Sequence, residues 1–266
     1  MIINKDISNL IYKRTSTRAF KDTGLNDIQL QKIKSYIDDY RNQEGIFSFV
    51  RFELMKNRGN SVFGIYGHIT GAEYFVAVIA KDSKKSLLDA GFAFQKHMLF
   101  AEKIGLGTCW LAATSFDRSA AKLNIALEKD EIVAAISPIG EKAVERSSAE
   151  IEIRKQYDSN NRLEFDTLFI DAKTGGRITN EEIKQELNHV RLAPSAINNQ
   201  PWRVIVEGDV THFYVVRMSN RLLSYDYEMM DIGAALCNYS TATGKNRFLI
   251  KEPYFDIPYE YVISVE

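Results

Sequence analysis

The chain has few of the residues that build covalent cross-links or metal sites. Its 266 residues include two cysteines, Cys109 and Cys237, and four histidines that lie far apart in the sequence. Two cysteines do not form a disulfide framework, and no cysteine or histidine pair has the spacing of a metal-binding motif. We therefore expect neither a disulfide framework nor a metal site.

Long apolar runs and an excess of one charge are also missing. No run approaches the roughly 18–20 apolar residues that a membrane span needs, and residues 1–6 lack the features of a signal peptide. The chain has 34 basic and 35 acidic residues, a net charge of −1, which gives no general attraction to nucleic acid or to an anionic membrane. We expect a cytoplasmic protein that binds neither, with any anion site confined to a local cluster.

The composition is that of a globular protein, with 45% hydrophobic and 26% charged residues. A chain of this length can bury a core as one large domain or as two small ones. Residues 86–104 are apolar on most sides of a helix, which is typical of a helix buried at the centre of a fold. Helices alternate with strands, and strands also follow one another, so the pattern predicts an α+β layered fold. The expected strands are 74–80, 108–112, 132–136, 204–206, 212–216 and 261–265.

Two predicted helices begin in a similar way. Asn26 is a candidate N-cap with Gln29 three residues later, and Thr179 has Glu182 at the same spacing. This spacing is that of a capping box, in which each side chain satisfies the other residue's backbone N–H.

A second similarity follows further along the chain. An Asp-x-Gly-x-Ala pattern occurs at 89–93 and again at 231–235, which is 142 positions later. The repeated order of helix start, strand and Asp-x-Gly-x-Ala helix predicts a tandem duplication with halves 1–156 and 157–266.

The stretch 193–202, Ala-Pro-Ser-Ala-Ile-Asn-Asn-Gln-Pro-Trp, connects a predicted helix to a predicted strand. Its two prolines fix φ and remove N–H donors, so we expect a stiff loop. The side chains of Ser195, Asn198 and Gln200 can both donate and accept hydrogen bonds. This combination suits the edge of a planar heteroaromatic ligand, and it equally suits a structural turn in which the amides bind neighbouring backbone.

Three motifs together resemble the nitroreductase family of flavoproteins. The stretch 193–202 resembles the family's Ala-Pro-Ser-x-x-Asn-x-Gln-Pro-Trp, and 14–20, Arg-Thr-Ser-Thr-Arg-Ala-Phe, resembles its Arg-x-Ser-x-Arg-x-Phe. The third motif is Asp-Ala-Gly-Phe-Ala at 89–93 followed by Gly-Leu-Gly-Thr-Cys-Trp at 105–110. The resemblance covers nearly the whole chain, and it implies a nitroreductase-like fold with central antiparallel or mixed sheets and flavin mononucleotide (FMN) as the cofactor.

The resemblance assigns the phosphate and ribityl chain of FMN to the first motif. The residues that carry over are Arg14, Thr15, Ser16 and Arg18. If this stretch is helical, the two arginines share a face, and guanidinium groups match phosphate in a bidentate geometry. A further pair, Arg154 and Lys155, lies where the family often has basic residues that close over the phosphate. Both would otherwise lie on a solvated strand edge.

The resemblance assigns the flavin ring to the other two motifs. Pro194, Ser195, Ala196 and Asn198 would contact the isoalloxazine ring, and Gln200, Pro201 and Trp202 would act as scaffold. Relatives offer a backbone N–H to the flavin N5 region from a Gly-Gly or Glu-Gly pair. This chain has Ala112 and Ala113 there, with two extra residues, so the N5 contact is left open. Cys109 is expected to be a buried apolar residue.

The order of the motifs differs from that of ordinary family members, in which the Pro-Trp loop lies about one helix after the arginine motif. Those members are homodimers with FMN at the subunit interface, and a fused duplicate would form this interface within one chain. The counterpart of the loop, 40–49, retains no family residue, and the counterparts of the two arginines are Thr167 and Asp171. An aspartate there would repel a phosphate. We therefore predict one FMN per chain at the interface of the halves. A monomer would contain the complete site, and a dimer is left open.

The resemblance further implies an NAD(P)H oxidoreductase in which FMN carries the chemistry and no side chain acts as a catalytic acid or base. NADH or NADPH would reduce FMN and leave before a small-molecule acceptor, such as a nitroaromatic or a quinone, takes the hydride. Three alternatives stay open: flavin-dependent dehalogenation or dehydrogenation of a specific substrate, a flavin-binding sensor or carrier without turnover, and a structural protein that has lost the cofactor.

Overall fold

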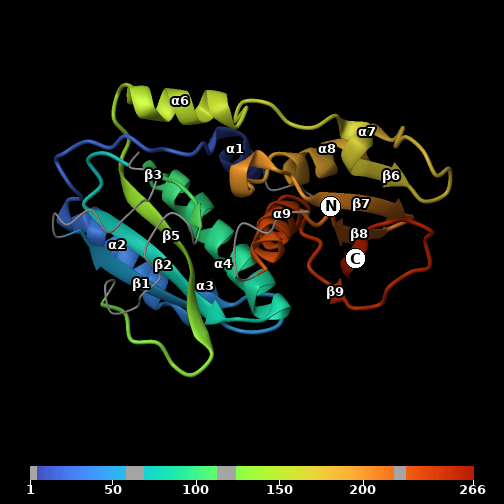
Figure 1. The fold of residues 1–266 in the computed structure, drawn as a ribbon, viewed down its shortest axis with the longest axis horizontal. Coiled ribbons are helices and arrows are strands. Elements are labelled where there is room, and N and C mark those ends of the chain that lie inside the picture. Colours follow the sequence, from blue (N-terminus) through green and yellow to red (C-terminus); the bar gives the residue numbers. More distant parts are fainter. Residues whose placement is uncertain (1–4, 58–68, 113–123, 219–225) are drawn as a thin grey trace.

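The computed structural model describes residues 5–57, 69–112, 124–218 and 226–266. Two five-stranded sheets lie on either side of a pair of long central helices (Figure 1). The predicted α+β class, with a buried central helix, is confirmed.

The first sheet is antiparallel and has the strand order β1-β2-β5-β3, with β4 also paired to β5. Its strands are β1 (Arg51–Lys56), β2 (Tyr74–Lys81), β3 (Leu106–Thr108), β4 (Leu111–Ala112) and β5 (Glu131–Glu141). The prediction of one continuous strand over 108–112 is wrong, because pairing stops at Cys109 and Trp110. Pro138 of the facing strand has no N–H to offer, and the Cys109 N–H donates to Ser137 Oγ at 3.2 Å instead.

The second sheet has the order β6-β7-β8-β10-β9. Its strands are β6 (Phe169–Asp171), β7 (Trp202–Glu207), β8 (Val210–Val215), β9 (Phe248–Leu249) and β10 (Glu260–Val265). The order β7-β8-β10-β9 corresponds to β1-β2-β5-β3 of the first sheet, with a central helix after the second strand in each. Among the described strands, β4 of the first sheet and β6 of the second have no counterpart in the other sheet, and β6 pairs with β7 in parallel.

The two central helices are α4 (Lys84–Lys103) and α9 (Tyr227–Thr243), which lie side by side between the sheets (Figure 1). They touch backbone to backbone at Gly91 and Gly233. A Cβ on Gly91 would lie 2.2 Å from Met230 O, and a Cβ on Gly233 would lie 2.2 Å from Leu88 O. Leu88 and Met230 are 142 positions apart, as are the two glycines, so the contact is reciprocal. Only glycine permits so close an approach.

Shorter helices surround this centre. They are α1 (Lys5–Lys13), α2 (Asp27–Asp38), α3 (Tyr40–Gln43), α6 (Ser148–Gln156), α7 (Phe165–Leu168), α8 (Glu181–Arg191) and a 3₁₀ turn, η1 (Ala196–Asn198). The predicted capping box of α2 is confirmed, since Asn26 Oδ1 accepts from Gln29 N at 2.9 Å and Gln29 Oε1 accepts from Asn26 N at 3.0 Å. The predicted cap of α8 is wrong by one residue. Asn180 is the N-cap in place of Thr179, because its Oδ1 reaches two backbone donors at once.

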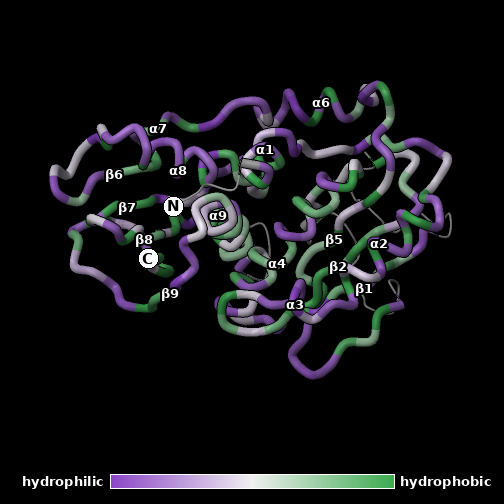
Figure 2. The backbone as a smooth tube through the Cα atoms, turned by 180° about the vertical axis from the view of Figure 1, so that it is seen from behind, coloured by the Kyte–Doolittle hydropathy of each residue, from purple (hydrophilic) through white to green (hydrophobic). Residues whose placement is uncertain are grey.

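Helix α1 belongs to the first part of the sequence but lies against the second. It packs on α8 and α9 as well as on α4, and the ring centroids of Tyr12 and His189 are 5.7 Å apart. Both ribbon views place α1 between α6 and α8, above α9 (Figures 1 and 2). The residues that follow its last turn, from Arg14 on, therefore lie at the boundary between the two sheets.

Hydrophobic side chains of both sheets pack around α4 and α9 in one large core. Figure 2 shows the corresponding hydropathy, with hydrophobic strands inside and hydrophilic segments around the outside. No helix within the described ranges combines the length and the apolar composition that a membrane span requires.

Candidate functional site

The arginine motif leaves α1 as an extended segment. Helix α1 ends at Lys13, so the expectation that Arg14 and Arg18 share a helical face is wrong. The backbone pairs with the edge of β3 instead, where Thr17 N donates to Thr108 O at 2.8 Å and Ser16 bridges to Thr108. The free edge of β3 offers hydrogen bonds that a continued helix could not use.

The guanidinium of Arg14 is buried and forms no ion pair with any carboxylate among the residues that the structure describes. Arg14 is 8% exposed, and its Nη1 has no hydrogen-bond partner in the part of the chain that the structure describes. Burial, and after it the positive charge of Arg162, lower the pKa of Arg14 to about 10. A desolvated cation of this kind is costly unless an anion completes its environment.

Four arginines from three segments lie within electrostatic range of one another, and we call them the arginine cluster: Arg14, Arg18, Arg154 and Arg162. The pKa of Arg154 is lowered by burial, then by Arg146, and in part by Arg18. The pKa of Arg162 is lowered by burial, then by Arg191 and Arg154. Like charges gathered in this way repel each other and attract a multivalent anion.

One carboxylate sits at the edge of this cluster. Glu150 of α6 is 2% exposed, and its two oxygens bind Arg146 Nε at 3.1 Å and the backbone N–H of Arg18 at 2.9 Å. It therefore ties α6 to the arginine motif through the peptide backbone. Within the described ranges, the four guanidinium groups of the cluster form no ion pair with any carboxylate.

The second part of the site is the Pro-Ser loop, which we define as residues 194–200 between α8 and β7. Three of its non-glycine residues have left-handed backbone: Ile197 at φ 48°, Asn198 at φ 58° and Gln200 at φ 51°. A β-branched residue in this region is a true outlier, and such conformations persist only where neighbouring contacts hold them. Two hydrogen bonds hold this loop, one internal and one to α9: Gln200 N donates to Ser195 Oγ at 2.9 Å, and Ala196 N donates to Asp231 Oδ1 at 3.0 Å.

The Pro-Ser loop is also bonded to residues 157–163, which we call the connector because they join α6 to α7. The amide nitrogen of Asn198 donates to three connector carbonyls, those of Tyr157, Asp158 and Asn161. Its Oδ1 accepts from Arg162 Nη1 at 3.3 Å. The arginine cluster and the Pro-Ser loop, predicted as two ends of one site, are thus joined through Arg162.

The remaining predicted residues differ in their exposure. Thr15 and Lys155 are exposed. Arg154 lies on α6, so the alternative of a solvated strand edge is wrong for this pair. Pro194, Ser195 and Ala196 are half-buried. Ala112 ends β4, whereas Ala113 lies outside the described residues.

Arg162 was not predicted. It is a single basic residue within the polar run 158–162 and belongs to none of the three motifs. Its importance comes from tertiary placement, since its partner Asn198 is 36 positions away. The sequence alone carries no local signal for such a contact.

In the first part of the chain, residues 46–48 are bound by a carboxylate of the central helix α4. Asp89 of α4 accepts from Ile46 N at 2.6 Å, from Phe47 N at 2.9 Å and from Ser48 Oγ at 2.6 Å. Asp231, its equivalent on α9, has a single bond in the described part of the chain, and its Oδ2 is buried without a partner. Burial raises the pKa of Asp231 well above its usual range.

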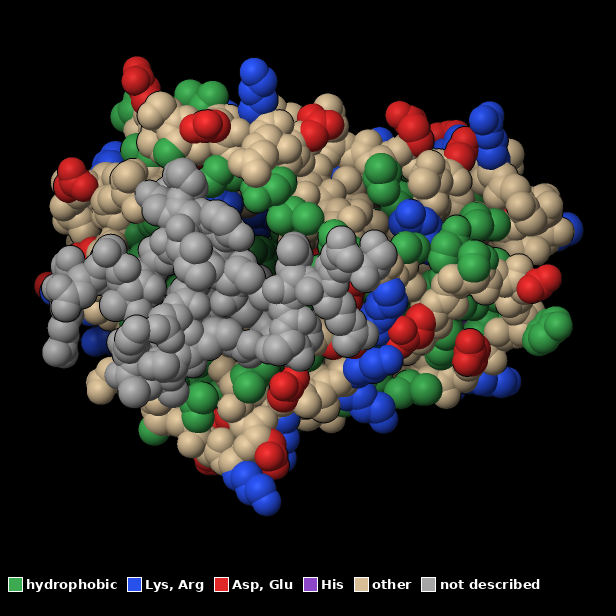
Figure 3. All heavy atoms as spheres, viewed as in Figure 1, with side chains coloured by type: hydrophobic (Ala, Val, Ile, Leu, Met, Phe, Trp, Pro, Cys, Tyr) green, Lys and Arg blue, Asp and Glu red, His purple; other side chains and the backbone are tan. Residues whose placement is uncertain are grey.

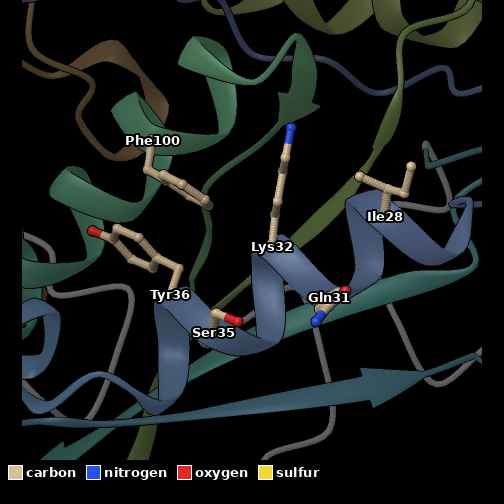
Figure 4. A pocket seen from close by; sticks show the side chains of 6 residues that line it. All are labelled: Ile28, Gln31, Lys32, Ser35, Tyr36 and Phe100. Carbon is tan, nitrogen blue, oxygen red and sulfur yellow. The ribbon is translucent and has the colours of Figure 1, made fainter.

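The rest of the surface shows a weaker candidate. Acidic and basic side chains are interspersed over the visible part of the face in Figure 3. A shallow pocket of about 400 Å³ lies between α2 and α4, away from the arginine cluster (Figure 4). It is lined by Ile28, Gln31, Lys32, Ser35, Tyr36 and Phe100, with the last two rings stacked at 4.1 Å. Across the described residues, no group of three or more His, Cys, Asp or Glu side chains is placed to hold a metal ion.

Comparisons with known proteins agree with this arrangement. The family model described as "Putative TM nitroreductase" matches residues 6–243. A comparison with curated proteins found no match. Among solved structures, a nitroreductase titled as putative from Thermotoga maritima MSB8 is similar, with a TM-score of 0.62 and 17% identity over 97% of this chain and 92% of that one. At this identity the likeness shows a shared fold.

Two further solved structures match a smaller share of the chain. A nitroreductase family protein from Clostridium difficile 630 has a TM-score of 0.43 and 17% identity, covering 60% of this chain and 94% of that one. An FMN-dependent nitroreductase from Clostridium difficile R20291 has a TM-score of 0.41 and 18% identity, covering 55% of this chain and 95% of that one.

Proposed function

Because the chain belongs to the nitroreductase family, a family of oxidoreductases, we propose that it is an FMN-dependent NAD(P)H oxidoreductase. Bound FMN would carry hydride from NADH or NADPH to a small acceptor such as a nitroaromatic or a quinone. The observation that carries this proposal is the buried guanidinium of Arg14, whose Nη1 has no hydrogen-bond partner among the described residues, within a cluster of four arginines that adjoins the Pro-Ser loop.

The arginine cluster fits a phosphate. Arg14, Arg18, Arg154 and Arg162 would surround the FMN phosphate, and guanidinium groups bind phosphate oxygens in pairs of short, charge-assisted hydrogen bonds. The phosphate dianion would supply an ion-pair partner to guanidinium groups that have none among the described residues. Ser16, which lies beside this cluster, would bind the ribityl chain.

The Pro-Ser loop would lie along the flavin ring. The hydroxyl of Ser195 accepts a hydrogen bond from Gln200 N and keeps its own hydrogen free for an acceptor on the ring. The N–H of Ala196 is taken by Asp231, so Pro194 and Ala196 would contribute van der Waals contact. A loop held by one internal hydrogen bond and one bond to α9 would meet the ring without a large ordering cost.

We also propose that the chain is a tandem duplicate, with halves 1–156 and 157–266, that holds one FMN at the interface of its halves. The reciprocal contact of Gly91 and Gly233 and the matching strand orders support this origin. A second site would need the counterparts of the loop and of the clamp. Residues 46–48 of the loop's counterpart are bound by Asp89 of α4, and Asp171, the counterpart of Arg18, accepts from Thr174 N in a turn.

The test is the flavin stoichiometry of the purified protein. The protein is saturated with FMN, freed of excess, and denatured so that the released flavin can be counted per chain. We expect one FMN per chain in the wild type and substoichiometric FMN in Arg14→Gln. The matched control is Arg41→Gln, because Arg41 is an exposed arginine paired with Asp39 at 2.6 Å. Two FMN per chain would contradict the single site, and no FMN would contradict the cofactor itself.

Anaerobic mixing with NADH and with NADPH then separates an enzyme from a flavin carrier. We expect the absorbance of bound FMN near 450 nm to bleach with at least one nicotinamide and to return when a nitroaromatic or a quinone is added. Bound FMN that neither nicotinamide reduces would favour the sensor or carrier.

A further inference from the structure

We infer that Asn198 positions Arg162 for the anion and does not itself contact the flavin ring. The identity of the anion, the phosphate of FMN, rests on the proposed function. The role of Asn198 rests on the contacts of its side chain, which join the Pro-Ser loop to the connector.

The hydrogen-bonding capacity of Asn198 is largely used within the chain. A side-chain amide offers two N–H donors and one oxygen with two lone pairs. The nitrogen of Asn198 is 3.0 Å from Asp158 O, 3.2 Å from Asn161 O and 3.4 Å from Tyr157 O, so both donors are engaged. Its oxygen accepts from Arg162 Nη1. No donor remains for a flavin carbonyl.

Arg162 depends on Asn198 for its position. Its guanidinium donates to Ser159 O at 3.2 Å and to Asn161 O at 2.8 Å, but both carbonyls belong to the connector itself. Two bonds fix the group against the body of the protein. Nε donates to Arg191 O at 3.1 Å, and Nη1 donates to Asn198 Oδ1 at 3.3 Å. Without Asn198, Arg162 would keep one anchor and could turn away from Arg14.

The backbone at Asn198 suits this role. Its φ of 58° places it in the left-handed region, which asparagine tolerates better than most residues. The side chain therefore leaves the loop in a direction that right-handed backbone would not give. A further hydrogen bond, from Leu163 N to Gln200 Oε1 at 2.8 Å, fixes the end of the connector to the Pro-Ser loop. The side chain of Asn198 thus connects the Pro-Ser loop to Arg162 of the arginine cluster.

The substitution Asn198→Gly tests this inference, because glycine keeps the left-handed backbone and removes only the side chain. Asn198→Asp is the second variant, since it keeps the size of the side chain but sets a negative charge beside Arg162. The control is Asn199→Ala: the neighbouring asparagine has right-handed backbone, and its side chain has no hydrogen bond in the described part of the protein. Circular dichroism and a thermal melt establish that each variant is folded.

Binding is measured with three probes, by calorimetry or fluorescence: inorganic phosphate on the apoprotein, FMN, and riboflavin, which lacks the phosphate. We expect both Asn198 variants to weaken phosphate and FMN binding about tenfold, the size of one charge-assisted hydrogen bond. Riboflavin binding should change by less than about twofold, and Asn199→Ala should leave all three affinities unchanged. In an Arg162→Gln background, Asn198→Gly should have no further effect on FMN affinity.

Other outcomes would distinguish a role of Asn198 in positioning Arg162 from a role at the flavin ring. Equal losses for FMN and riboflavin would overturn the inference, because they would mean that Asn198 acts at the ring or on the loop as a whole. Unchanged phosphate binding in both variants would also overturn it. If the wild type binds inorganic phosphate but neither flavin, the proposed cofactor fails, while the phosphate data still decide the role of Asn198.

Discussion

The backbone contact between α4 and α9 makes a sharp prediction for Gly233→Ala. A Cβ at this position would lie 2.2 Å from Leu88 O and 2.7 Å from Phe92 N, both of them main-chain atoms of a buried helix. Neither atom can move as the end of a flexible side chain could, so the two helices must separate. The equivalent substitution Gly91→Ala would meet Met230 O at 2.2 Å and should behave alike.

Two effects of opposite sign decide the size of the change. In an isolated helix, alanine is favoured over glycine by roughly 1 kcal/mol. Overpacking of a tight core costs about 1–3 kcal/mol and occasionally more, and here the obstacle is backbone, which places the cost at the upper end. We expect a net loss of about 2 kcal/mol in the free energy of unfolding, or roughly 4–8 °C in Tm for a protein of this size.

The assay is urea unfolding followed by far-UV circular dichroism, with Gly176→Ala as the control. A Cβ on Gly176 would meet only Thr174 Oγ1 at 3.8 Å, so this substitution should change stability by less than about 0.5 kcal/mol. Helix propensity alone predicts that Gly233→Ala is stabilising. A neutral or stabilising result at both Gly91 and Gly233 would show that the helices do not cross at these residues and would refute the reasoning.

Three further predictions concern buried polar groups. Burial lowers the pKa of His97 from 6.5 to about 3, so the unfolded chain binds a proton that the folded protein does not. Stability should therefore fall by about 2 kcal/mol between pH 7 and pH 5 through this residue. Urea titrations of His97→Leu should show a pH slope smaller by this amount, with the remainder carried by other groups such as His189 and His212, whose pKa values burial also lowers. A slope equal to that of the wild type would contradict the buried neutral state of His97. Asp89→Ala leaves three hydrogen-bond donors without an acceptor and should lower the free energy of unfolding in urea by about 3 kcal/mol. Asp231→Ala leaves one donor without an acceptor and should lower it by about 1 kcal/mol. The reverse ranking would contradict the hydrogen-bond assignment. Arg14→Met should stabilise the apoprotein by about 1–3 kcal/mol and abolish phosphate binding, and a variant that unfolds more easily without ligand would show that the Arg14 charge is compensated.

Local patterns predicted the elements whose causes are local. The capping box at Asn26 and the apolar helix that became α4 depend on neighbours within a few residues. Gly105, with φ of 79°, follows the end of α4 in the left-handed conformation that is common for glycine at helix ends. The N-cap of α8 was misassigned because Thr179 and Asn180 are both residue types that cap helices. The backbone conformation before the helix decides which of the two reaches the free N–H groups.

Long-range contacts account for what the sequence could not predict. The extended run after Arg14 depends on the edge of β3, about 90 positions away, and the break at Cys109 depends on Pro138 in another strand. The role of Arg162 depends on a connector that lies against the Pro-Ser loop. A motif match identified the loop and the arginines, but the side-chain partners of Asn198 appear only in three dimensions.

The contact between α4 and α9 joins two parts of a single polypeptide, and this has a consequence for how the protein responds to dilution. An interface between separate subunits is lost when the protein concentration falls below its dissociation constant. Here the covalent chain from 104 to 226 keeps both helices at a fixed effective concentration. The arrangement around the arginine cluster and the Pro-Ser loop should therefore persist unchanged in a nanomolar assay and at low abundance in a cell.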